Sequence, residues 1–157
     1  MLIVMAGLPG SGKSSVADVL GVELGCAVLS VDPIEAAMWR AGVDRQQPTG
    51  IAAYVVAEEL ARVQLGLGHD VVVDAANDVD AAREQWRLLA TSSGAKLVFV
   101  EVVCTDAVEH RRRLAARRRN ILGFPEPSWE SVLERRVGWR VLVNVATPRT
   151  VRSVAAR

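Results

Sequence analysis

The sequence has few aromatic residues, few lysines and few cysteines. Aromatic side chains make up 4% of 157 residues, so Val, Leu and Ala must supply most of any core. Lysine occurs only at Lys13 and Lys96. The two cysteines, Cys26 and Cys104, stand alone in apolar runs, with no CxxC or Cys/His cluster beside them. This pattern argues against a disulfide framework or a zinc site. We expect two buried thiols in a reducing cytoplasm.

Long hydrophobic runs and excess charge of one sign are also missing. The apolar run from Leu2 to Met5 is followed at once by glycine, and no basic leader or membrane span is recognisable. We therefore expect a cytoplasmic protein that does not associate with membranes. The formal net charge of +1 gives no global reason to expect a polyanionic partner. The length favours one domain spanning residues 1–157.

Short apolar runs alternate with amphipathic stretches along the chain. Strands are expected at residues 2–5, 27–29, 71–73, 97–103 and 141–145. Val16, Val19, Leu20 and Leu24 recur at helical spacing in the first helix. The next helix is expected to start with Asp32 as its N-cap and Pro33 at its first position. Further helices are expected at about 51–67 and 80–91, after Thr105-Asp106, and from Ser128. This alternation predicts a three-layer α/β domain around a parallel five-stranded sheet. It leaves the strand order undetermined.

One motif carries specific chemistry. Residues 7–14 read Gly7-Leu8-Pro9-Gly10-Ser11-Gly12-Lys13-Ser14, the complete pattern of a P-loop. Its glycines let successive N–H groups turn inward around an anion, and the following helix adds the positive end of its dipole. Lys13 can reach the β- and γ-phosphates of ATP, and the Ser14 hydroxyl can bind Mg²⁺. The sequence therefore predicts a P-loop NTPase fold with ATP and Mg²⁺ as cofactors.

Three further features favour a kinase among P-loop proteins. No Asn-Lys-x-Asp motif for reading guanine occurs, and the chain is short for a motor. An arginine-rich helix followed by a loop containing Gly123, Pro125 and Pro127 lies where small kinases carry a helical lid. We place this predicted lid at about residues 117–128.

The sequence resembles a family of small P-loop kinases that includes chloramphenicol phosphotransferase, the kinase domain of phage polynucleotide kinase, and zeta toxins. The resemblance rests on Gly7 to Ser15, on Ser30-Val31-Asp32 with Arg40 after it, on Gly68 to Asp74, and on Arg113 with Arg117. It implies that the P-loop through Ser15 binds nucleotide. It also implies that Asp32 is the base that takes the proton of the acceptor and that Asp74 orients Mg²⁺ through water. Family members often have an arginine three residues after this aspartate, where this chain has Glu35.

The same resemblance assigns Arg113 and Arg117 to the lid, where they would contact the γ-phosphoryl group or adenine. Four residues apart, they should share one face of a helix. The neighbouring arginines at 111, 112, 118 and 119 are more typical of a solvated face, and an RNA-binding patch is the alternative. We expect His69 and His110 to be surface or structural residues.

Several residues keep two interpretations. Asp32 serves as a helix cap or as a base, and Asp74 as a metal ligand or as a turn residue. Asn77 contacts the acceptor or a metal-bound water, or it starts a helix. Trp39 belongs to the core or walls the acceptor pocket, beside Arg40.

The sequence thus predicts an ATP-dependent phosphotransferase that acts on a hydroxyl of a small molecule such as an antibiotic, nucleoside or sugar. The alternatives are a polynucleotide 5′-kinase and an ATP-hydrolysing switch without an acceptor. The identity of the acceptor and the oligomeric state cannot be read from the sequence.

Overall fold

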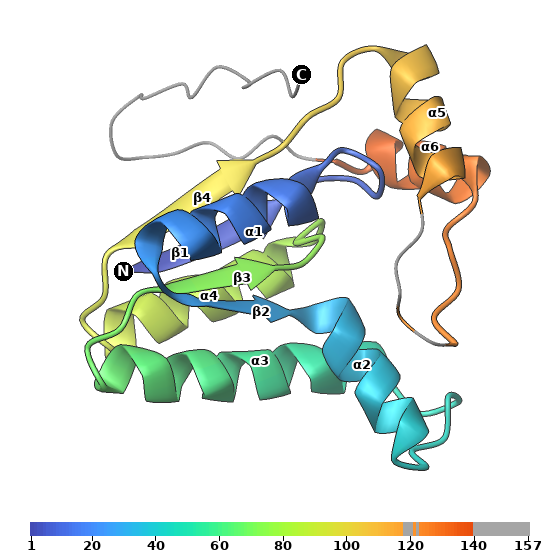
Figure 1. Cartoon of the computed structure of the whole chain (residues 1–157). Coiled ribbons are helices and arrows are strands. Elements are labelled where there is room, and N and C mark those ends of the chain that lie inside the picture. Colours follow the sequence, from blue (N-terminus) through green and yellow to red (C-terminus); the bar gives the residue numbers. More distant parts are fainter. Residues whose placement is uncertain (118–120, 122, 140–157) are drawn as a thin grey trace.

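The computed structural model describes residues 1–117, 121 and 123–139. Helices and strands alternate through most of this part of the chain (Figure 1). In order they are β1 (Leu2–Ala6), α1 (Lys13–Leu24), β2 (Ala27–Ser30), α2 (Val31–Arg40), α3 (Thr49–Gly66), β3 (Val71–Asp74), α4 (Asp80–Ser92), β4 (Leu97–Glu101), α5 (Ala107–Ala116) and α6 (Trp129–Val137).

The strands form one parallel sheet in the order β2-β3-β1-β4. Helix α1 covers one face, and α3 and α4 cover the other, so the three predicted layers are confirmed (Figure 1). Four strands lie within the described residues, and the strand expected at 141–145 lies outside them. The register pairs Ser30 with Asp74, which brings the ends of β2 and β3 together.

The core divides into two clusters because side chains along a strand alternate between the faces of the sheet. On the side of α3 and α4, Leu2 and Val4 of β1 pack in one cluster with Trp86 and Leu89. On the side of α1, Ile3 packs in the other cluster. Trp86 and Leu89 of α4 are completely buried.

The spacing of the valines in α1 correctly predicts a helix, but the valines do not form its buried face. Ala17 is fully buried, whereas Val19 is 60% exposed and Val22 81% exposed. A Cβ atom on Gly21 would lie 2.4 Å from a methyl group of Val28. Small residues therefore face the sheet, because α1 and β2 approach too closely for larger ones.

Three details differ from the sequence predictions. Helix α2 begins at Val31 with Ser30 as its N-cap, so Asp32 lies inside the first turn and is not the cap. Strand β2 runs directly into α2, since Ser30 is also the last residue of that strand. Cys26 and Cys104 are half-exposed and not buried. Within the described residues, no helix combines the length and apolar character needed to cross a bilayer.

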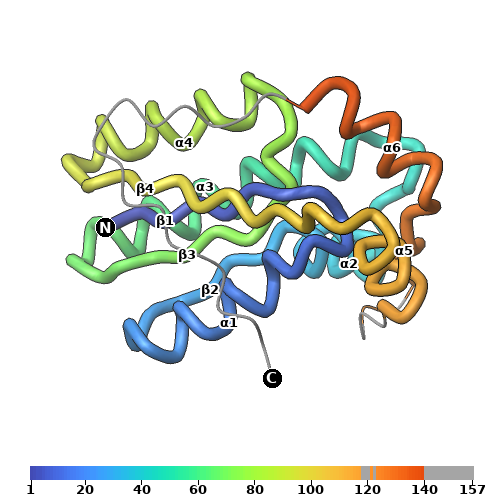
Figure 2. Tube along the Cα trace, turned by 90° about the horizontal axis from the view of Figure 1, so that it is seen from above, coloured from blue at the N-terminus to red at the C-terminus, as the bar shows by residue number. Residues whose placement is uncertain are grey.

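One end of the molecule gathers the elements that surround the P-loop. Figures 1 and 2 place α2, α5 and α6 beyond the carboxyl ends of the strands, at the same end as the turn between β1 and α1. Ligands of open α/β sheets bind at this edge.

Candidate active site

The P-loop joins the end of β1 to the start of α1. Gly10 and Gly12 have φ angles of 82° and 100°, in the left-handed region where residues with a Cβ are strained. Gly12 is the N-cap of α1, and no side chain caps this helix end. The first turn of α1 therefore presents its dipole to the loop, which is the arrangement that binds phosphate.

A buried ion pair lies at the centre of the site. Lys13 Nζ lies 3.8 Å from Asp74 Oδ1, and each side chain is 8% exposed. Because Asp74 ends β3 next to β1, the sheet holds this carboxylate beside the first residue of α1. Burial of either charge alone would be strongly unfavourable, so the pair is held together by its exclusion from water.

Two buried polar atoms here have no hydrogen-bond partner in the described structure. They are Ser11 Oγ and Asp74 Oδ1. Orphaned polar atoms are rare in folded interiors and indicate a water, an ion or a ligand. The donor set fits Mg²⁺, which favours oxygen ligands and commonly binds through one or two protein groups, phosphate and water. In the described part of the chain, no group of three or more His, Cys, Asp or Glu side chains could hold a metal ion. A Mg²⁺ ion here would therefore need phosphate and water as further ligands.

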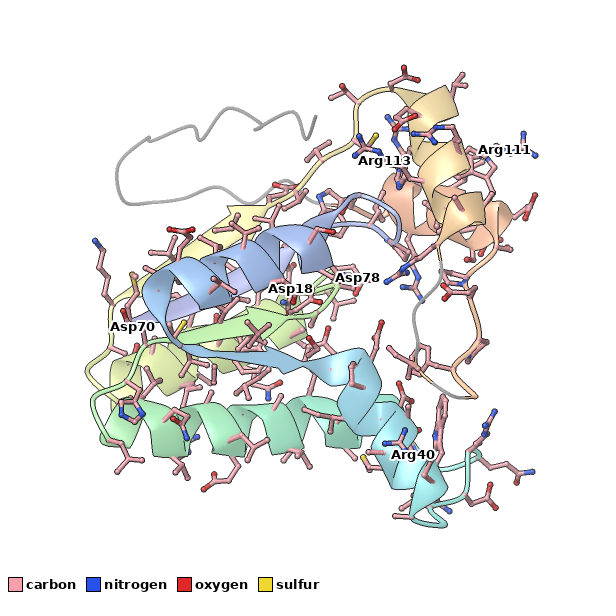
Figure 3. All side chains as sticks on the ribbon, viewed as in Figure 1. Asp18, Arg40, Asp70, Asp78, Arg111 and Arg113 are labelled. Atoms are coloured by element: carbon pink, nitrogen blue, oxygen red, sulfur yellow. The ribbon has the colours of Figure 1, made fainter. Side chains whose placement is uncertain are left out.

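Helix α5 carries an arginine to the rim of the P-loop. A Cβ atom on Gly12 would lie 3.9 Å from Arg113 Nη1. Figure 3 shows Arg113 on the side of α5 that faces the P-loop and Arg111 on the opposite side. Glu109 accepts hydrogen bonds from Arg112 and Arg113, and these bonds lower the pKa of Glu109 to about 2. One carboxylate therefore restrains Arg113 at the loop.

Arg117 does not lie on helix α5, where the sequence predicted it. Helix α5 ends at Ala116, and Arg117 has extended backbone angles, φ −60° and ψ 129°. Arg113 and Arg117 therefore do not share a helical face. The Arg117 side chain is 16% exposed, and its Nη1 lies 3.9 Å from Glu126 Oε2 in the predicted lid.

Helix α2 carries residues that the sequence predicts to contact the acceptor. Asp32 is half-buried in the first turn, two residues beyond Ser30. Trp39 lies seven positions further on the same helical face. Its Nε1 donates to Thr49 Oγ1 at 2.9 Å, and this hydroxyl donates to Glu35 Oε1 at 2.7 Å. Phe124 of the predicted lid stacks on Trp39 with ring centroids 5.2 Å apart.

A protein family described as an AAA domain matches residues 2–137 of this chain. The chain belongs to this AAA domain family. Threonine synthase-like 1 of Mus musculus is 26% identical over 118 residues, which cover 74% of this chain and 15% of that protein. The chain thus spans much less than two thirds of this relative's length.

Solved structures share the fold of this AAA domain. Chaetomium thermophilum Kti12 with ADP-AlF3 has a TM-score of 0.69 at 19% identity, covering 90% of this chain and 81% of that chain. Gluconokinase of Sinorhizobium meliloti has a TM-score of 0.61 at 18% identity, covering 88% and 74%. Mycobacterium tuberculosis APS kinase CysC with AMPPNP and APS has a TM-score of 0.58 at 23% identity, covering 80% of each chain. These similarities show a kinase-like P-loop fold.

Two residues that were predicted to contact the acceptor have other surroundings in this AAA domain. Asn77 is fully buried: its Nδ2 donates to the Met5 carbonyl, and its Oδ1 accepts from Trp86 Nε1. With both ends of its amide used inside the protein, Asn77 presents no group to an acceptor. Arg40 is exposed at the end of α2 remote from α5 (Figure 3).

Two residues of the site region, Glu109 and Phe124, are missing from the sequence predictions. Glu109 could have been found, because Glu and Arg four residues apart on a helix form ion pairs. Phe124 gave no signal, since its contact with Trp39 joins segments that are distant in the sequence.

Proposed function

We propose that this AAA domain is an ATP-dependent phosphotransferase that moves the γ-phosphoryl group to a hydroxyl of a small acceptor. The observation that carries the proposal is the position of three charged groups at one edge of the sheet. The buried Lys13–Asp74 pair lies there, and Asp32 lies two residues beyond Ser30, the register partner of Asp74.

ATP and Mg²⁺ fit the residues present. Gly7 to Ser15 would hold the phosphates, with the orphaned Ser11 hydroxyl and the N-terminal turn of α1 inside this stretch. Ser14 and Asp74 would hold Mg²⁺, Asp74 through water. When bound, Mg²⁺ supplies positive charge that stabilises the oxygens of the transferring group.

The chain's own residues have the remaining roles in phosphoryl transfer. Lys13, Arg113 and Arg117 offset negative charge on the phosphoryl group. Asp32 orients the acceptor hydroxyl and takes its proton. Trp39, held by Thr49, forms a wall for the acceptor.

Two observations favour a small acceptor over a nucleic acid. Arg112 and Arg113 share Glu109, so part of the arginine cluster is neutralised within α5. The gluconokinase and the APS kinase that share the fold have small acceptors in their names.

The test is an acceptor screen with ATP and Mg²⁺, read by mass spectrometry for an added phosphate. Antibiotics, nucleosides, sugars, amino acids and a short oligonucleotide would be included, with Lys13→Ala protein as the control. A phosphorylated small molecule that depends on Lys13 is the expected result. Release of ADP with no phosphorylated product would favour the hydrolysing switch instead. Phosphorylation of the 5′ end of an oligonucleotide alone would favour a polynucleotide kinase.

A further inference from the structure

His110 is a buried residue of α5 that contacts the P-loop directly. It is 2% exposed, and its Nε2 lies 2.8 Å from the carbonyl oxygen of Pro9. A carbonyl only accepts hydrogen bonds, so Nε2 must carry the proton and donate. In a loop whose N–H groups turn inward toward phosphate, carbonyl groups are left facing outward. His110 satisfies one of these outward carbonyls.

The contact belongs to a longer seam between α5 and the P-loop. His110, Arg113 and Leu114 occupy positions i, i+3 and i+4, which lie on one helical face. A Cβ atom on Gly10 would lie 3.2 Å from both His110 Cδ2 and Leu114 Cβ. The same face carries Arg113 Nη1 to within 3.9 Å of the Cβ position of Gly12. The helix therefore lies along the outer side of the loop, and the glycines permit the close approach.

The imidazole ring is also fixed from a second element. Trp129, the first residue of α6, meets it edge-on, with ring centroids 5.3 Å apart and planes at 87°. This T-shaped arrangement is the favoured geometry for aromatic pairs. Between Pro9 and Trp129 the ring of His110 has little freedom to rotate, so it sets the position of α5 along the loop.

We infer that His110 is a positioning residue for phosphoryl transfer: it fixes α5 on the P-loop so that Arg113 meets the transferring group. The inference rests on the proposed function. His110 touches the loop only from outside and acts through Arg113 and the loop backbone. A small displacement of a charged group around a reacting phosphoryl has large kinetic effects, since about 1 Å of misplacement can lower a rate roughly a hundredfold.

Two substitutions separate the hydrogen bond from the ring packing. His110→Phe keeps a ring against Gly10 and Trp129 but removes the donor to Pro9. We expect kcat to fall about tenfold or more, with a smaller change in the KM for ATP. His110→Gln can place an amide N–H near the position of Nε2, and it should recover most of the lost kcat. His69→Phe is the control, because His69 is exposed and bonds only to Gln64 in the described contacts.

A double-mutant cycle with Arg113→Gln distinguishes positioning from general stabilisation. If His110 acts through Arg113, His110→Phe should have little further effect on kcat in the Arg113→Gln background. The expected result is this non-additivity together with recovery by His110→Gln. The inference is overturned if His110→Phe retains wild-type kcat, if His110→Gln recovers nothing, or if the two effects on kcat simply add. Failure of the proposed function looks different, because the wild-type protein itself would then phosphorylate no acceptor.

Discussion

Lys13 and Asp74 form a buried pair across the junction of α1 and β3, with Nζ and Oδ1 3.8 Å apart. The distance exceeds that of a direct hydrogen bond, and Asp74 Oδ1 has no such bond within the described residues. Beside a phosphate-binding loop, such a pair can separate when ligands bind: the lysine can then contact a phosphate, and the carboxylate a metal ion.

The substitution Lys13→Ala should lower ATP turnover by at least about a hundredfold, because the lysine meets charge that develops in the transition state. Steady-state release of ADP measures the effect, and circular dichroism verifies the fold. Lys96→Ala is a matched control, since Lys96 is the only other lysine and is exposed. Near-normal turnover in folded Lys13→Ala protein would remove the basis for the nucleotide site.

The substitution Asp32→Asn tests the acceptor base. Ser30 and not Asp32 is the N-cap of α2, so the change should leave the melting temperature nearly unaltered. Phosphate transfer should fall about a hundredfold, the usual scale for loss of a general base. Affinity for ATP, measured by calorimetry, should persist. Asp18→Asn on the exposed face of α1 serves as the control. Transfer within a few-fold of wild type would show that the base lies elsewhere, with Asp74 the next candidate.

The hydrogen-bonded chain from Trp39 through Thr49 to Glu35 predicts an effect on acceptor binding. Thr49→Val removes the hydroxyl that links Trp39 to Glu35, and Thr49→Ser keeps this hydroxyl. We expect the KM for the acceptor to rise about tenfold in the valine variant, with the KM for ATP unchanged, since one lost buried hydrogen bond has about this effect. If the valine and serine variants have the same KM for the acceptor, Trp39 does not contribute to acceptor binding.

Asn77 should matter for stability. Asn77→Ala leaves Trp86 Nε1 without its acceptor and places alanine at a φ of 50°, where it is strained. We expect the free energy of unfolding to fall by about 3 kcal/mol, measured by urea denaturation. Glu23→Ala, an exposed change on α1, should alter it by less than about 0.5 kcal/mol. A comparably small loss for Asn77→Ala would contradict a structural role.

Tyr54 gives a spectroscopic prediction, because it is the only tyrosine. Burial raises the pKa of Tyr54 to about 12, against an ordinary value of 10. The raised pKa means that the unfolded chain releases the proton first, so this contribution to stability is complete below pH 10 and is lost as pH rises toward 12. Phenolate absorbance should show a midpoint near pH 12 in the folded protein and near 10 in denaturant. Coincident midpoints would place Tyr54 in contact with water.

Local sequence determined the elements and the P-loop. The pattern of Gly7 to Ser14 specifies a tight backbone turn and the start of the helix whose positive dipole end faces phosphate. Both features depend only on residues that are neighbours in the sequence. The alternation of apolar runs with amphipathic stretches predicted the parallel three-layer architecture, because each run and each stretch is also a local pattern. The strand expected at residues 71–73 is present as β3, which ends at Asp74, since strand ends are visible in the sequence.

Tertiary structure decided which side chains meet. Asn77 looked like a site residue from its place after β3, but packing turned it inward to Met5 and Trp86. His110 looked like a surface or structural residue beside a charged cluster, and docking of α5 placed it against Pro9, 101 positions earlier. Such pairings depend on how helices pack across the sheet. Helix packing is fixed by shape complementarity between distant segments, and no local pattern of residues records it.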